Sequence, residues 1–167
     1  MQKRARLILV IAAVAAVAAA IPLIAATGAP ARAGAGGGTG EPGKVAAELR
    51  KVIERNARAY NDENLGLMVS TVHPEAVLFE QTRDLMRHMV AAYDLKYEIL
   101  SFGYIGRDKD FAVVRVKQRT RKIRGPHFRD NELDAMHVLR LHGKEWKLWQ
   151  TAMLNVKFLD GARAAPK

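Results

Sequence analysis

The spacing of hydrophobic positions divides most of the chain into helices followed by strands. Residues 44–61 carry apolar side chains at three- and four-residue intervals, a pattern that predicts an amphipathic helix. The same intervals predict a short helix over residues 65–72, which His73-Pro74 ends because the residue before a proline avoids helical backbone angles. Residues 75–93 complete a run of three predicted helices.

After residue 93 the apolar positions alternate instead, as they do in strands with one buried face. Four segments share this pattern, at residues 95–105, 110–123, 132–142 and 145–156. In the second segment one parity is expected to face inward, and it comprises Ala112, Val114, Val116, Gln118 and Thr120. Helices followed by such strands predict an α+β fold, with helices packed on one face of an antiparallel sheet of about four strands.

The first 33 residues have the pattern of an export signal. Basic side chains precede an apolar stretch at residues 7–26, and Ala31-Arg32-Ala33 fits a small-residue cleavage site. The apolar stretch is also long enough to span a bilayer, so a cleaved signal peptide and an uncleaved membrane anchor both stay open. Either outcome predicts an extracytoplasmic domain, which is secreted, periplasmic or tethered to the membrane. The predicted parts are a signal or anchor, a Gly-rich linker, the domain and a tail, at residues 1–33, 34–43, 44–160 and 161–167.

The composition of the chain excludes several kinds of chemistry. The chain has no cysteine, which excludes disulfides and thiolate metal sites. The histidines lack the spacing of a metal site, and no phosphate loop, nucleophile elbow or dinucleotide motif is present. We therefore predict no metal and no cofactor. The formal net charge of +10 does not specify nucleic acid, and the predicted export argues against nucleic acid as a partner.

Three motifs carry a resemblance to a known family. Ala59-Tyr60-Asn61 precedes an acidic break, a short helix leads to His73-Pro74-Glu75-Ala76, and the closing hairpin contains Gly143, Trp146 and Leu148. This order resembles the nuclear transport factor 2-like superfamily, which includes ketosteroid isomerases, SnoaL-like cyclases, dehydratases and many binding domains. The resemblance implies a cystatin-like fold, in which a curved antiparallel sheet wraps around the helices and forms a cone with a pocket.

One departure from that superfamily concerns the wall of the pocket. Its members have a short hairpin after the His-Pro-Glu turn, whereas residues 77–83 are too few for a hairpin and contain no glycine. The missing hairpin implies that the pocket lacks part of its wall, and this favours a binding domain over an enzyme.

The resemblance also implies candidate catalytic residues. Glu80 falls near the carboxylate base of ketosteroid isomerases, His137 at their acidic oxyanion donor and Asn56 at their tyrosine donor. His137 also lies on the apolar parity of its strand, where a buried imidazole needs a partner or a ligand. The residues expected to line the pocket are Asn56, Tyr60, Tyr93, Gln118, Thr120, His137 and Gln150.

The outward parity of the second strand is basic. Arg115, Lys117, Arg119 and Arg121 follow one another there without an intervening acid. They form either an anion-binding face or a solvated face whose charges oppose edge-to-edge aggregation, and the sequence favours the solvated face.

Three functional hypotheses follow from these features. The first is an exported, non-catalytic domain that binds a small apolar ligand or a protein, and that forms a homodimer through the outer sheet face with help from Trp146 and Trp149. The second is a small acid–base enzyme of the isomerase or dehydratase type that uses Glu80 and His137. The third is a binder of anionic surfaces through the basic stripe at residues 115–124. The sequence favours the first hypothesis over catalysis.

Overall fold

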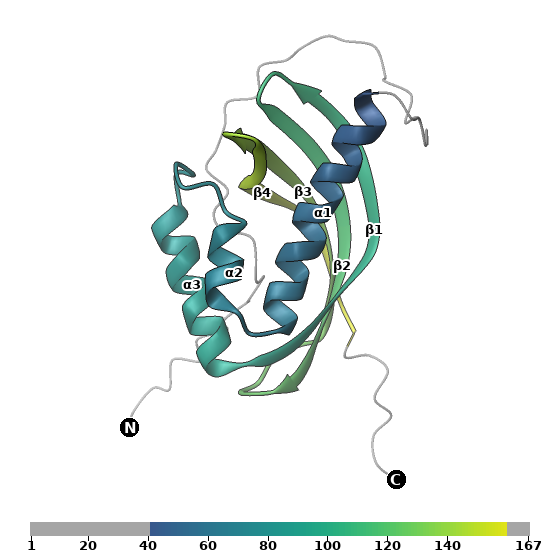
Figure 1. The fold of residues 1–167 in the computed structure, drawn as a ribbon. Helices are drawn as coiled ribbons and strands as arrows, with labels where there is room; N and C mark the ends of the chain where they lie inside the picture. Colours follow the sequence, from purple (N-terminus) through teal and green to yellow (C-terminus); the bar gives the residue numbers. More distant parts are fainter. Residues whose placement is uncertain (1–40, 160–167) are drawn as a thin grey trace, which may run out of the picture.

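Within residues 41–159, the part of the chain that the computed structural model describes, three helices precede four strands (Figure 1). The helices are α1 (Glu41–Asn61), α2 (Leu65–Ser70) and α3 (Phe79–Ala92). The strands, which form one antiparallel sheet in chain order, are β1 (Asp94–Asp108), β2 (Phe111–Arg124), β3 (Asn131–His142) and β4 (Glu145–Phe158). The predicted α+β class is confirmed, whereas the predicted export segment and tail lie outside the described residues.

Helix α1 is longer than the hydrophobic spacing predicted. It begins at Glu41 and so takes in three residues that were assigned to the linker. Pro42 is compatible with this first turn, because the N–H group that proline lacks would have no partner inside the helix there. The acidic break after Asn61 ends α1, with Glu63 in the left-handed region at a φ of 50° and the Asn64 N–H donating to the Ala59 carbonyl at 2.9 Å.

The core lies between α1 and the concave face of the sheet. Val45, Leu49 and Ile53 of α1 pack against Val114 of β2 and Leu139 of β3. The inward parity predicted for β2 is confirmed, since all five of its residues are buried. Such burial of apolar surface supplies most of the free energy that holds helix and sheet together.

The hairpin that closes the sheet departs from the prediction at one residue. Trp146 was expected to help form the outer face of the sheet, but it is buried in the core beside Leu148. The reason is its register, because Trp146 lies opposite Leu141, which also packs against the core cluster.

The segment between α2 and α3 is less helical than the sequence predicted. Helix α2 ends at Ser70 and α3 begins only at Phe79. Between them, Val72 makes a single parallel bridge with Leu148 of β4. The His73 N–H donates to the Leu148 carbonyl, and the Leu148 N–H donates to the Thr71 carbonyl, each at 2.8 Å. Within the described chain, this one-residue bridge lies just before the His-Pro-Glu turn, and residues 77–83 after the turn contain no strand.

Gly125, in the connection from β2 to β3, should be intolerant of any side chain. Its φ is +120°, and a Cβ atom there would approach the Ala92 carbonyl oxygen to 2.6 Å. We expect Gly125→Ala to lower the free energy of unfolding of the full chain by about 2 kcal/mol or more, measured by urea denaturation. The control is Gly106→Ala, since a Cβ at Gly106 meets nothing within 4 Å. Equal effects of the two substitutions would contradict the prediction.

Candidate functional site

His137 lies in the middle of β3 with its ring inside the core. Only 4% of the residue is exposed, and Nδ1 lies 2.8 Å from the Thr151 hydroxyl of β4. Burial lowers the pKa of this imidazole to about 4, so the ring is neutral at pH 7. The side chain is therefore a hydrogen-bonded member of the core in the folded protein.

Glu80 occupies the first turn of α3 and points away from that core. Its side chain is 61% exposed and forms an ion pair with Arg83 one turn further along the helix. The predicted acid–base pair is thus divided, because Glu80 contacts Arg83 at the surface whereas His137 contacts Thr151 inside the sheet.

Asn56 holds the end of α2 in place. Its Nδ2 donates to the Thr71 hydroxyl at 2.7 Å, and that hydroxyl donates to the Met68 carbonyl at 2.6 Å. Both side chains are buried, so these bonds satisfy groups that would otherwise destabilise the core. The Asn56 amide has a structural partner at the position where the resemblance implied a catalytic donor.

The three other predicted pocket residues on the strands lie on two faces of the sheet. Gln118 and Thr120 are buried on the inner face of β2, as their parity predicted. Gln150 is only partly buried, and it lies opposite Val138, whose neighbours His137 and Leu139 face the core. Gln150 therefore belongs to the outer face of the sheet.

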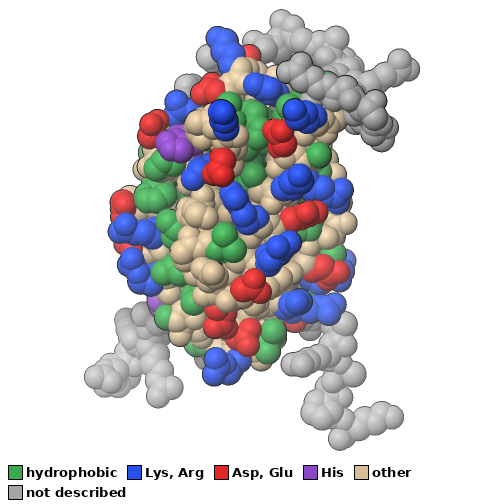
Figure 2. Space-filling view, in the orientation of Figure 1, with side chains coloured by type: hydrophobic (Ala, Val, Ile, Leu, Met, Phe, Trp, Pro, Cys, Tyr) green, Lys and Arg blue, Asp and Glu red, His purple; other side chains and the backbone are tan. Residues whose placement is uncertain are grey.

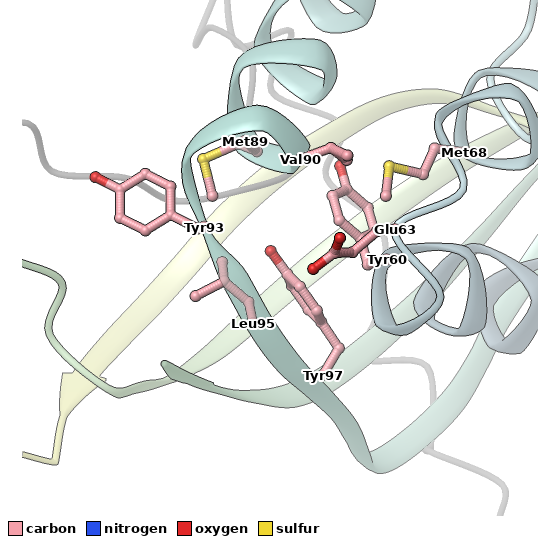
Figure 3. A pocket seen from close by; sticks show the side chains of 8 residues that line it. All are labelled: Tyr60, Glu63, Met68, Met89, Val90, Tyr93, Leu95 and Tyr97. Carbon is pink, nitrogen blue, oxygen red and sulfur yellow. The ribbon is translucent and has the colours of Figure 1, made fainter. Parts of the chain in front are cut away.

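Tyr60 and Tyr93 line a small pocket between the helices and β1 (Figure 3). The enclosed volume is about 10 Å³, which is about the room that one water molecule needs. Sequence reasoning missed the rest of the lining, which consists of Glu63, Met68, Met89, Val90, Leu95 and Tyr97. For Leu95 and Tyr97 the sequence does contain a signal, because their alternation at the start of β1 puts both side chains on the same face of the strand.

Ion pairs cover much of the basic stripe on the outer face. Arg115 contacts Asp134 through two hydrogen bonds of 2.9 and 2.8 Å. Arg119 contacts Glu132 at 2.7 Å and Glu98 at 3.3 Å. These arginines hold the pKa values of Asp134 and Glu132 below the usual range.

The two other cations of the stripe, Lys117 and Arg121, make no ion pair with another described residue. The outer face of β2 is therefore a mixture of neutralised and solvated charges.

A second cluster on the outer face surrounds Arg140 of β3. Its guanidinium group donates to Asp110 at 3.1 Å and to Glu75 at 2.9 Å. The same group lies over the rings of Trp149 and Phe111, at 4.7 and 5.4 Å from their centroids. This arrangement ties the turn after α2 to the sheet.

His73 packs beside the Arg140 cluster. Its ring meets those of Trp149 and His142 edge-on, each at a centroid distance of 5.0 Å, and its Nδ1 accepts a hydrogen bond from the Glu75 N–H at 3.1 Å. Burial and the nearby Arg140 charge lower the pKa of His73. The sequence analysis used His73 as the stop of a helix and as part of the family motif, and it did not predict these ring contacts.

Two further properties concern the described residues as a group. No three histidine, aspartate or glutamate side chains among residues 41–159 are arranged to hold a metal ion. No helix within these residues is both long and apolar enough to cross a membrane.

Acidification should destabilise the fold through His137. The pKa of this residue is lower in the folded chain, at about 4, than its ordinary value of 6.5, so the unfolded state binds the proton more readily. The contribution to stability is complete above pH 6.5 and is lost as the pH falls toward 4, with a total of about 3 kcal/mol. Urea unfolding of the full chain between pH 7 and pH 4 measures this loss. His137→Leu should show a pH dependence weaker by that amount, and an unchanged dependence in the variant would contradict the assignment.

Comparison with protein families and curated proteins gives one match. The sequence profile of the family described as "Anti-sigma-I factor RsgI9, C-terminal domain" matches residues 51–159. No curated protein matches the sequence.

Solved structures with the same fold share little sequence with the chain. A protein from Novosphingobium aromaticivorans described as a candidate aromatic ring hydroxylase has a TM-score of 0.59 at 13% identity, over 69% of this chain and 93% of that one. A protein of unknown function with a cystatin-like fold from Nostoc punctiforme has a TM-score of 0.52 at 11% identity, over 64% of this chain and 87% of that one. A nuclear transport factor 2-like protein of unknown function from Pseudomonas putida has a TM-score of 0.53 at 13% identity, over 66% of this chain and 85% of that one.

These likenesses confirm the nuclear transport factor 2-like, cystatin-like fold that the sequence motifs implied. At such low identity they establish the fold alone. Because the matched family profile covers more than half of the sequence, the chain belongs to the family of the C-terminal domain of the anti-sigma-I factor RsgI9.

Proposed function

We propose that the chain is a non-catalytic, extracytoplasmic domain that binds a protein partner. Residues 7–26 hold it at the membrane, or cleavage after Ala33 releases it. The observation that carries this proposal is that the candidate acid and base have separate partners, because His137 contacts Thr151 inside the sheet whereas Glu80 contacts Arg83 at the surface.

The state of the candidate catalytic groups supports a binding role. The pocket that Tyr60 and Tyr93 line encloses only about 10 Å³, far below the roughly 300 Å³ of an ordinary ligand cleft. His137 has a hydroxyl partner in the core, and Glu80 has an arginine partner at the surface. An acid and a base that act on one substrate must reach the same atoms, which this arrangement does not favour.

The family match supports a protein as the partner. The family is named after one domain of an anti-sigma-I factor, and an anti-sigma factor by its name acts on another protein. A domain at the C-terminal end of such a regulator, presented outside the cell by an N-terminal membrane segment, fits the role of a receptor for a signal.

The outer face of the sheet is the surface we propose for the partner. Val113, Met136 and Val138 lie at its centre and are only partly buried. The Arg115–Asp134 ion pair and the Arg140 cluster flank this centre, which gives the apolar middle and polar rim typical of protein interfaces. The face shown in Figure 2 carries Lys and Arg side chains interspersed with Asp and Glu, together with several groups of hydrophobic side chains. The partner is a second copy of the chain, as in a homodimer, or another protein.

Export can be tested with the full chain fused at its C-terminus to alkaline phosphatase, which is active only outside the cytoplasm. We expect high phosphatase activity, and we expect Leu9→Arg combined with Val14→Arg to abolish it, because two charges in the apolar stretch oppose insertion. Equal phosphatase activity of the wild-type and the doubly substituted fusion, or no activity of the wild-type fusion, would contradict the proposed location.

Binding through the outer face can be tested with Met136→Arg, which puts a charge at the centre of the proposed interface. We expect sedimentation velocity of the full chain in mild detergent to detect a dimer or a complex with a co-purified protein, and we expect Met136→Arg to weaken that association at least tenfold. The matched control is Val77→Arg, at a residue that is 85% exposed in the turn before α3, and it should have no effect. A wild-type chain that sediments as a monomer without a companion would contradict the proposal.

A further inference from the structure

We propose that the pocket between α1, α2, α3 and β1 binds a primary ammonium group carried on an alkyl chain. This site is distinct from the protein-binding face proposed above. It shares Tyr60 and Tyr93 with the pocket that the family resemblance implied, but neither His137 nor Glu80 lines it.

The first observation is the hydroxyl of Tyr97. The residue is 4% exposed, and its Oη atom is buried without a hydrogen-bond partner among the described residues. The ring cannot easily turn to find one, because it packs against the Tyr60 ring at a centroid distance of 4.6 Å. The backbone of Tyr97 is fixed as well, since its N–H donates to Asn61 Oδ1 at 2.7 Å and its carbonyl accepts from Asn61 Nδ2 at 3.0 Å. A buried hydroxyl without a partner destabilises the free protein.

The second observation is the backbone of Glu63, which also lines the pocket. Its φ of 50° is in the left-handed region, at the position after a helix where glycine is the favoured residue. Glutamate is thus strained where glycine would not be. In Figure 3 the Glu63 carboxylate and the Tyr97 hydroxyl are both directed toward the middle of the labelled side chains. The unpaired Tyr97 hydroxyl and the left-handed backbone of Glu63 each lower the stability of the free protein. Two such features in one pocket are typical of a binding site.

The charge and the size of the pocket define the chemistry of its ligand. Glu63 is the only charged side chain in the lining, and burial raises the pKa values of Tyr60 and Tyr97, so both hydroxyls stay neutral at pH 7. A negative pocket with aromatic walls favours a cation and disfavours an anion.

The enclosed room of about 10 Å³ accepts a group the size of a water molecule, and a primary ammonium is of that size. Its N–H groups can donate to the Tyr97 hydroxyl oxygen and to the Glu63 carboxylate, which supplies the partner that the hydroxyl lacks.

The apolar residues of the lining suit an alkyl chain. Met68, Met89 and Leu95 surround the enclosed room, and the flexible methionines can shift to admit a ligand. A neighbouring hollow of about 250 Å³ shares Val90 and Tyr93 with the pocket and is also lined by Asp94 and Arg124. An alkylammonium group of this kind comes either from a free amine or from the lysine side chain of another protein.

The binding experiment uses the full chain in mild detergent with its methionine methyl groups labelled with ¹³C. Titration with n-butylammonium should shift the Met68 and Met89 methyl resonances in a saturable manner. The Met153 resonance, from an exposed residue of β4, should not move. Neutral n-butanol and anionic butyrate should bind at least tenfold more weakly.

A capped lysine peptide distinguishes the two sources of the group. The peptide is Nα-acetyl-lysine-N-methylamide, in which only the side-chain amine is free. If it binds at least as tightly as n-butylammonium, the ligand is a lysine side chain. If it binds tenfold more weakly, the ligand is a free amine.

Two variants test the proposed contacts. Tyr97→Phe and Glu63→Gly should each weaken n-butylammonium binding at least tenfold, while the midpoint of thermal unfolding stays equal or rises. The control is Asp62→Asn, which removes the adjacent carboxylate outside the pocket and should change binding less than twofold. The proposal is wrong if n-butanol binds as well as n-butylammonium, if Met68 and Met89 do not respond, or if both variants keep full affinity. It is also wrong if Tyr97→Phe lowers the unfolding midpoint, because the hydroxyl would then have a partner in the free protein.

Discussion

The backbone bridge between the turn after α2 and Leu148 of β4 determines how the helices lie against the sheet. Only two hydrogen bonds form it, one from the His73 N–H and one to the Thr71 carbonyl, each 2.8 Å long. With these bonds made, Val72 enters the core and the Thr71 hydroxyl meets Asn56. The bridge therefore joins the turn to β4 and brings both of these buried side chains into the core.

The same bridge also shapes the outer face. Neighbouring residues of an extended segment point to opposite sides, so the register that buries Val72 in the core directs His73 to the other face. There His73 meets the ring of Trp149, and the following Glu75 reaches Arg140. The burial of Val72 and the Arg140 cluster are thus two results of one register, and they support each other because the cluster fixes the turn from outside.

Local patterns predicted the fold well, whereas the site depended on geometry that no local pattern contains. The inward parity of β2 follows from its own alternation, so Val114 and Val116 were assigned correctly. Gln150 was assigned to the interior, but a register shift in β4 between the partners of Val138 and Leu139 inserts one residue and reverses the face. Glu80 was a candidate for the catalytic base of the pocket, but it lies exposed in the first turn of α3, where it pairs with Arg83.

The core and the pocket at the start of β1 differ in whether their buried polar groups have hydrogen-bond partners. In the core each such group has a partner, as His137 has in Thr151 and Asn56 has in Thr71. Three buried polar atoms of the described chain lack a partner, and two of them are single Nε atoms of Arg55 and Arg83, whose guanidinium groups carry further donors. A tyrosine side chain has no second polar atom, so the unpaired Tyr97 hydroxyl carries the full free-energy cost of desolvation. Stability alone would therefore favour phenylalanine at that position, and the proposed ammonium ligand would supply the partner that the hydroxyl lacks.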